Sequence, residues 1–255
     1  MIMSFEGKHA LVTGGGSGIG AAIAFALAKA GANVTICGRR RPELESTAAR
    51  HNNIHAEAAD VTDEASIAQL YQRAQTARDK FSIVVANAGT AESAPAEKVS
   101  HEVWNRIINV NLTGAFFSVQ PALAGMRENK WGRIVFIAST AGLKGYPYVA
   151  PYVAAKHGVV GLTRTLALET AKANITVNAV CPGFTETSLL DRAVDLITAR
   201  TNLTEADTRQ VLAANNPQGR FLQPQEVADT VVWLCSKESA AITGQTISVS
   251  GGETW

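Results

Sequence analysis

A tyrosine and a lysine, Tyr152 and Lys156, lie four positions apart in a stretch of helical periodicity. Residues i and i+4 share one helix face, so the Cβ atoms of the pair are about 5 to 6 Å apart. A phenol has a pKa of about 10, and a neighbouring cation lowers it by stabilising the phenolate. Lowering it by two to three units takes roughly 3 to 4 kcal/mol. The pair predicts a proton donor and acceptor; a buried tyrosine beside a surface lysine is the alternative.

Two further polar residues complete a set that can reduce a carbonyl group. Ser139 ends an apolar run 13 residues before Tyr152, and Asn111 lies in an earlier helix-periodic stretch. Ser139 can donate a hydrogen bond to a carbonyl oxygen and Tyr152 can pass that oxygen a proton, while a nicotinamide supplies the hydride. A Tyr-x-x-x-Lys pair alone arises by chance on amphipathic helices. Its combination with Ser139, Asn111 and a glycine-rich turn favours catalysis.

The glycine-rich turn, Thr13 to Gly20, follows the first apolar run and leads into an alanine-rich helical stretch. Glycines let the backbone approach a pyrophosphate, and a helix start offers free N–H groups and about half a positive charge. A turn placed between a strand and a helix indicates dinucleotide binding. Its spacing is G-x-x-x-G-x-G. The residues expected at the cofactor are Gly14, Ser17, Gly18, Ile19 and Gly20.

The residues after the second apolar run indicate which dinucleotide binds. A carboxylate about 20 residues after the turn binds the 2'-hydroxyl of NAD, whereas an arginine accommodates the 2'-phosphate of NADP. This chain has Arg39, Arg40 and Arg41 there and no acidic residue. A guanidinium holds a phosphate through two charge-assisted hydrogen bonds. NADP(H) is therefore favoured, with Arg39 as the phosphate ligand and its two neighbours solvated; NAD(H) is the alternative.

Two more strand ends are expected beside the cofactor. Asp60 and Val61 follow the third apolar run, where the adenine would lie. Asp60 can instead help to cap the next helix, and the two roles are compatible. Asn87, Ala88 and Gly89 close the fourth run, where small residues and a turn-forming asparagine let the cofactor pass over the backbone.

The elements that position these residues alternate regularly along the chain. Several apolar runs are apolar on both faces, which is typical of parallel strands covered by helices on both sides. Strand and helix alternation predicts a three-layer, doubly wound α/β Rossmann fold with a seven-stranded parallel sheet. Ligands of such sheets bind beyond the carboxyl ends of the strands. The predicted strands are 9–13, 33–38, 54–59, 82–87, 133–139, 175–181 and 246–250, and the predicted helices are 19–30, 42–51, 64–80, 101–127, 151–173 and 225–234.

Composition excludes several classes of protein. The 255 residues include 23 basic and 22 acidic side chains, a net charge of +1, and 18% are charged. This length fits a single domain over residues 1–255, and the composition excludes disorder. Without a basic field we expect no nucleic acid and no membrane as partner. No 18 apolar residues run uninterrupted and no secretory signal opens the chain, so a cytoplasmic location is predicted.

Two other sets of residues bear on partners and bound groups. Three scattered cysteines, Cys37, Cys181 and Cys235, predict buried thiols and neither a disulfide nor a metal site. Arg127, Lys130 and Arg133 are interpreted as a solvated helix end, with docking of an acidic carrier as the alternative.

One stretch, residues 184–217, breaks the alternation between the sixth and seventh strands. A long insertion at the carboxyl end of a sheet is usually a substrate-binding loop or lid. A plain pair of surface helices is the alternative.

These motifs together resemble the compact, single-domain short-chain dehydrogenases/reductases over nearly the whole chain. The matching residues, in order, are Thr13 to Gly20, Asp60, Asn87-Ala88-Gly89, Asn111, Ser139, Tyr152, Lys156 and Pro182-Gly183. Many NADP(H)-dependent members have a basic residue where this chain has Ser17, so the cofactor prediction depends mainly on Arg39.

The resemblance implies a role for each polar residue. Tyr152 would be the general acid in reduction and the general base in oxidation. Lys156 would bind the nicotinamide ribose and lower the pKa of Tyr152. Ser139 would orient the substrate carbonyl, and Asn111 would hold a water that extends the proton relay. The residues that would flank the nicotinamide are Pro182, Gly183 and Thr185.

The sequence around Tyr152 and after 178 is similar to 3-oxoacyl-(acyl carrier protein) reductases and polyketide ketoreductases, which reduce thioester-bound β-keto groups. We therefore expect NADPH-dependent ketone reduction on a small-molecule or thioester-bound substrate. An NAD-dependent secondary-alcohol dehydrogenase is the alternative, and a silent dinucleotide sensor a remote one. The resemblance also implies a homotetramer. The apolar residues expected to line the substrate pocket are Tyr146, Tyr148, Phe184, Leu189, Leu190 and Val194.

Overall fold

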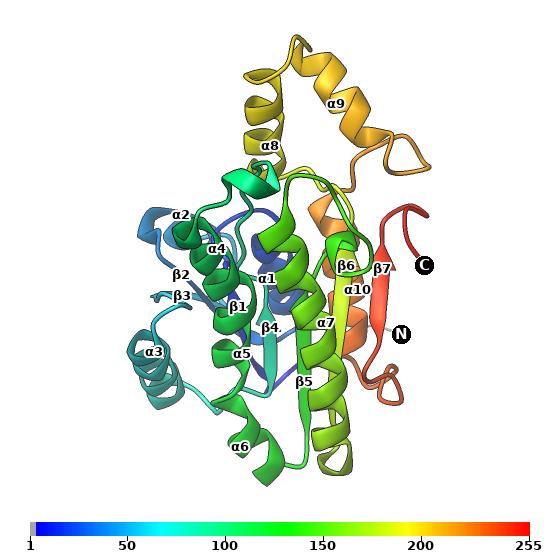
Figure 1. The fold of residues 1–255 in the computed structure, drawn as a ribbon. Helices are drawn as coiled ribbons and strands as arrows, with labels where there is room; N and C mark the ends of the chain where they lie inside the picture. Colours follow the sequence, from blue (N-terminus) through cyan, green and yellow to red (C-terminus); the bar gives the residue numbers. More distant parts are fainter. Residues whose placement is uncertain (1–3) are drawn as a thin grey trace.

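Seven parallel strands form one sheet in the computed structural model, which describes residues 4–255 (Figure 1). The strand order is β3-β2-β1-β4-β5-β6-β7, so the winding reverses at β1, which pairs with both β2 and β4. The doubly wound single-domain α/β fold predicted from the sequence is confirmed. The strands are β1 (His9–Thr13), β2 (Asn33–Gly38), β3 (Ile54–Ala58), β4 (Ile83–Ala86), β5 (Gly132–Ile137), β6 (Ile175–Pro182) and β7 (Thr246–Val249).

Helices cover both faces of the sheet, each over its own apolar core. On one face lie α1 (Gly18–Lys29), α2 (Arg41–Ala48) and α10 (Pro224–Cys235), which bury Leu27, Leu44 and Val231 against the strands. On the other face lie α3 (Glu64–Ala77) and α7 (Ala150–Thr170), with the segment between β4 and β5. Because both faces are covered, the central strands are apolar throughout, as the sequence pattern indicated.

The predicted helix over 101–127 corresponds to one helical stretch, His101–Glu128, which is not regular α-helix throughout but consists of several pieces. These are α4 (His101–Ile108), a π-helical turn (Asn109–Thr113), α5 (Gly114–Val119) and α6 (Ala122–Glu128). The Asn111 side chain donates to the Ile107 carbonyl at 2.9 Å and competes with the helical ladder. Pro121, between α5 and α6, has no N–H to continue the helix.

The stretch His101–Glu128 also meets the length and mean hydropathy of a membrane-spanning helix, with a value of 1.2 and 39% of the window buried. Core helices of folded domains meet the same criterion. Here Val119 and Met126 are buried in the core beside the sheet.

The insertion 184–217 forms two helices, α8 (Ser188–Thr198) and α9 (Glu205–Ala213), which project beyond the carboxyl ends of the strands at the top of Figure 1. Leu190 and Val194 are buried, while Arg209 on α9 pairs with Glu186 and, at 2.7 Å, with Asp191. The insertion is thus a packed pair of helices. Its role as a substrate-binding loop or lid stays a prediction.

Arg133 is fully buried, so its interpretation as part of a solvated helix end is wrong. It lies on β5, where its guanidinium donates to the carbonyl oxygens of Gly132 and Asn174 at 2.8 and 3.3 Å and lies 4.6 Å from the Trp131 ring centre. Carbonyl oxygens and an aromatic face replace the water that a charge needs. The three cysteines are buried, as predicted.

Candidate active site

Every predicted site residue lies near the carboxyl edge of the sheet or on a segment that leaves it. The glycine turn follows β1, Arg39 follows β2, and Asn87 and Ser139 follow β4 and β5. The turn and Asn87 meet between β1 and β4, where the winding reverses. This is the place where doubly wound folds bind their ligands.

Lys156 is buried on α7 beneath Tyr152. Its side chain is 4% exposed, its Nζ donates to the Ile137 carbonyl at 2.8 Å, and it lies 5.5 Å from the Tyr152 ring centre. The bond to Ile137 anchors the ammonium to the end of β5, two residues before Ser139. Burial lowers the pKa of Lys156 to about 8. The group is therefore still mainly charged at pH 7.

Tyr152 has a raised pKa in this arrangement, opposite in sign to the lowering expected from the lysine. Burial is the largest cause and outweighs the hydrogen bond of the Ser139 side chain, which lowers the pKa of the phenol. The Lys156 ammonium lies beneath the ring and is bonded to a carbonyl, so it does not ion-pair with the phenol oxygen. Tyr152 is thus held as a neutral donor, the form that reduction of a carbonyl needs.

Ser139 begins a tight turn immediately after β5. Its Oγ accepts a hydrogen bond from the Ala141 amide at 3.1 Å, which leaves the hydroxyl proton available. Predicted strand five ran to Ser139, but β5 ends at Ile137 because the chain turns here. The serine therefore points a donor toward the phenol of Tyr152 from a fixed turn.

Asn111 joins the π-helical turn to the loop after β4. Its Nδ2 donates to the Thr90 carbonyl at 2.8 Å and its Oδ1 accepts from the Thr90 amide at 3.3 Å. A Cβ at Gly89 would lie 2.9 Å from Asn111 Oδ1 and 3.8 Å from Lys156 Nζ. Asn111, Gly89 and Lys156 therefore lie close together, and the Asn111 side chain is used to bind the loop after β4 to the π-turn.

The glycine turn leaves the start of α1 without a side-chain cap. Ser17, the residue before α1, makes no side-chain cap, and the first turn holds no acidic residue, so the N–H groups after it lack a side-chain partner. A Cβ at Gly20 would lie 2.3 Å from the Gly14 carbonyl oxygen, so only glycine allows this close turn. Ile19 lies partly buried in the first turn of α1. The residues present fit a dinucleotide.

Thr13 and Asn87 hold the turn against β4. The Asn87 side chain donates to the Thr13 and Gly14 carbonyls at 2.9 and 3.3 Å, and Thr13 Oγ1 accepts from the amides of Asn87 and Ala88. The sequence analysis included Thr13 in the turn without giving it a role. The only feature of the sequence that could have predicted this role is a residue with a hydroxyl group at the end of β1, where the winding of the sheet reverses.

Arg39 differs from its two neighbours. Arg40 pairs with Glu43 at 2.8 Å and Arg41 with Glu45 at 2.9 Å, whereas Arg39 is exposed and has no ion pair or hydrogen-bond partner in the described part of the chain. Its guanidinium therefore stays available beyond the end of β2.

Asp60 holds a turn of its own. Its Oδ1 accepts from the amide and hydroxyl of Thr62 at 2.9 and 2.8 Å, while Asp63 is the residue that caps α3. Asp60 therefore does not cap the helix directly. Val61 is buried against Gly114 of α5, which fixes the turn to the fold.

The residues expected to flank the nicotinamide lie at the end of β6 and just after it. Gly183 donates its amide to Val249 of β7 at 3.0 Å, and Thr185 is buried with its Oγ1 on the Gly183 carbonyl at 3.0 Å. Pro182 is the last residue of β6. The Phe184 ring lies edge-on to Tyr146 at 6.4 Å, so two of the residues expected in the substrate pocket do meet. Tyr148, by contrast, is 63% exposed.

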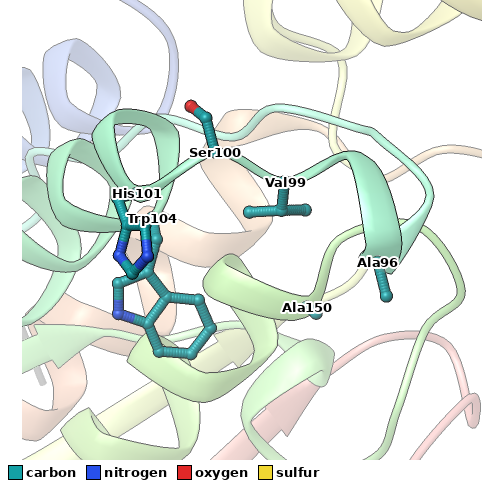
Figure 2. Close-up of a pocket in the computed structure, with 6 residues that line it drawn as sticks. All are labelled: Ala96, Val99, Ser100, His101, Trp104 and Ala150. Carbon is teal, nitrogen blue, oxygen red and sulfur yellow. The ribbon is translucent and has the colours of Figure 1, made fainter.

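A hollow of about 280 Å³ lies beside the start of α7 (Figure 2). Trp104 and His101 of α4 line it together with Val99 and Ala150, so it flanks the helix that carries Tyr152 without including any predicted catalytic residue. Its apolar lining comes from the α4 and α7 side of the molecule.

The fold and the site define a dinucleotide-dependent oxidoreductase of the Rossmann type. Residues 8–195 match the family model described as short chain dehydrogenase, and the chain belongs to the short-chain dehydrogenase/reductase family.

Relatives within the family bear several names. The chain is 36% identical to a D-beta-hydroxybutyrate dehydrogenase of Rhizobium meliloti, over 97% of this chain and 98% of the relative. It is also 36% identical to a 3-oxoacyl-(acyl-carrier-protein) reductase of Aquifex aeolicus, over 99% of both. Among solved structures, a variant of actinorhodin polyketide ketoreductase with NADPH superposes with a TM-score of 0.94 at 36% identity, covering 98% of this chain and 99% of that one.

Proposed function

We propose that the protein is an NADPH-dependent ketoreductase that reduces a carbonyl such as a 3-oxoacyl thioester. The observation that carries the proposal is the convergence of Ser139, Tyr152 and Lys156 at the sheet edge, beside the uncapped start of α1. The polyketide ketoreductase structure with NADPH and the 3-oxoacyl-(acyl-carrier-protein) reductase relative support this substrate class.

The chain's own residues account for binding and protonation. Amides at the start of α1 receive the pyrophosphate, and Arg39 receives the 2'-phosphate. The bound dinucleotide supplies the hydride. Ser139 donates a hydrogen bond to the substrate carbonyl and the neutral Tyr152 donates the proton to its oxygen. Lys156, charged at pH 7 and 5.5 Å from the Tyr152 ring centre, stabilises the phenolate that remains through its charge, without a direct ion pair, and holds the ribose hydroxyls.

A second candidate is oxidation of a secondary alcohol with NAD, which the D-beta-hydroxybutyrate dehydrogenase relative favours. The unpaired Arg39 and the absence of an acidic residue directly after β2 favour NADP(H). The two candidates share the catalytic residues, so the cofactor, the substrate and the direction separate them.

The test is a spectrophotometric screen of NADPH and NADH oxidation with β-keto thioesters, cyclic ketones and aryl ketones, and of NAD and NADP reduction with the matching alcohols. We expect the largest kcat/KM for NADPH with a β-keto thioester. Turnover of NAD with a hydroxy acid at a larger kcat/KM would favour the second candidate. The absence of any hydride transfer would refute both.

A further inference from the structure

The residues after β7 fold back over the carboxyl edge of the sheet and bring Glu253 into the wall of the site. The turn depends on Gly251, whose φ is +64° and where a Cβ would lie 1.9 Å from Asn216 Oδ1. The Thr254 amide donates to Ser250 Oγ at 3.2 Å and closes the turn. Residues 250–254 therefore form a defined turn. Gly251 and Gly252 of this C-terminal tail lie against Asn216 and Pro217, at the end of the insertion 184–217.

Glu253 binds two residues of the loop that follows Ser139. Its side chain is 1% exposed, Lys144 Nζ lies 3.0 Å from Oε1, and the Tyr146 hydroxyl donates to the same oxygen. Because Tyr146 gives its only proton to the carboxylate, its oxygen must accept from Thr140 Oγ1, 2.7 Å away. Burial and the bond to Glu253 raise the pKa of Tyr146, so it remains a donor.

This chain of hydrogen bonds ends beside the substrate-facing serine. Thr140 directly follows Ser139 and is buried, and the amide of Ala141, in the same turn, binds Ser139 Oγ. Holding Thr140 by its hydroxyl therefore fixes the turn that directs Ser139. The Tyr146 ring also packs on Phe184, which links the same loop to the start of the insertion.

The second carboxylate oxygen argues for more than a stabilising role. Glu253 Oε2 is buried without a hydrogen-bond partner among residues 4–255, and a Cβ at Gly183 would lie 3.0 Å from it. A buried, half-satisfied carboxylate costs stability, so a residue chosen for stability alone would not be expected here.

We propose that Glu253 is a positioning residue for the reduction, which acts on Ser139 through Tyr146 and Thr140. The inference rests on the proposed function of Ser139. It assigns part of the active-site wall to the C-terminal tail, more than 100 residues away in the sequence.

The test compares Glu253→Ala with Glu253→Gln, which keeps an acceptor for Tyr146, and with Glu238→Ala, an exposed control in the loop after α10. For Glu253→Ala we expect kcat to fall about tenfold or more, NADPH Kd to stay within about twofold, and amide exchange of residues 139–148 to accelerate. Glu253→Gln should restore most of kcat and the exchange protection. The control should match the wild type in all three.

A double-mutant cycle separates this role from a general loss of stability. Tyr146→Phe breaks the same chain at its middle link, so the double variant with Glu253→Ala should be no slower than the slower single variant. The proposal would be overturned if the fold-losses in kcat of the two single variants multiplied in the double variant. It would also be overturned if Glu253→Ala lowered Tm but left kcat per folded enzyme and the amide exchange of residues 139–148 unchanged. If the wild type reduced no ketone, the proposed function would fail, while the exchange measurement would still decide whether Glu253 holds the loop.

Discussion

Reversing the charge of Arg39 tests the cofactor assignment directly. Arg39 is exposed and unpaired, so its bond to a 2'-phosphate belongs at the lower end of charged hydrogen bonds, about 1.5 kcal/mol. An aspartate there adds a repulsion of about 1 kcal/mol at 4 Å in water. Together the loss of about 2.5 kcal/mol corresponds to a fall of roughly 70-fold in kcat/KM for NADPH.

The assay measures initial rates of Arg39→Asp with NADPH and NADH against one ketone. The value for NADH should stay within about threefold, since its 2'-hydroxyl neither needs the guanidinium nor is repelled by a carboxylate. Arg41→Asp is the matched control, because Arg41 is tied to Glu45. An NADPH to NADH preference that Arg39→Asp leaves unchanged would refute the reasoning, as would an equal effect of Arg41→Asp.

Three other predictions concern proton transfer and acid stability. Tyr152→Phe should lower kcat about 10²- to 10⁴-fold with NADPH Kd nearly unchanged; near-normal turnover would remove Tyr152 from the mechanism. Since the pKa of Lys156 is lowered to about 8 and reduction uses its charged form, kcat/KM should fall about tenfold per pH unit above 8; a profile level to pH 10 contradicts this. His9 is buried neutral between the Asp79 carbonyl and Thr35 Oγ1, and burial lowers its pKa to about 4. The unfolded chain therefore binds the extra proton between pH 6.5 and 4, and stability is lost as pH falls. The loss from pH 7 to 5, measured by urea unfolding, should be about 2 kcal/mol smaller in His9→Gln.

The sequence predicted the fold because its signals are local. All seven strands were found, since apolar runs on both faces are visible without any tertiary information. The π-turn inside the helical stretch 101–128 was not predicted, because it depends on Asn111 reaching the Thr90 and Ile107 carbonyls, which periodicity does not encode. The burial of Arg133 was missed for the same reason: the carbonyl oxygens of Gly132 and Asn174 that hold it meet only in the folded chain.

In the candidate site, too, local features were predictable from the sequence and tertiary ones were not. Ser139, Tyr152 and Arg39 follow strands or share a helix face, so spacing alone was enough to predict them as candidates. The sign of the pKa shift at Tyr152 depends on how deeply the ring is buried and on where Lys156 places its ammonium, and it came out opposite to the expectation. Glu253 had no signal at all, because its partners Tyr146 and Lys144 lie more than 100 residues away.

Substrate choice depends on residues other than the catalytic ones. Relatives at 36% identity over nearly their whole length bear names as different as D-beta-hydroxybutyrate dehydrogenase and 3-oxoacyl-(acyl-carrier-protein) reductase. A donor pair such as Ser139 and Tyr152 serves any ketone, so it does not discriminate among ketones. Discrimination must come from groups that contact the rest of the substrate, and a hydrophobic pocket alone separates homologues by only about 1 to 3 kcal/mol. If the α8–α9 insertion and the loop that Glu253 binds line the substrate pocket, as we propose, substitutions there should change specificity while the chemistry of Tyr152 is retained.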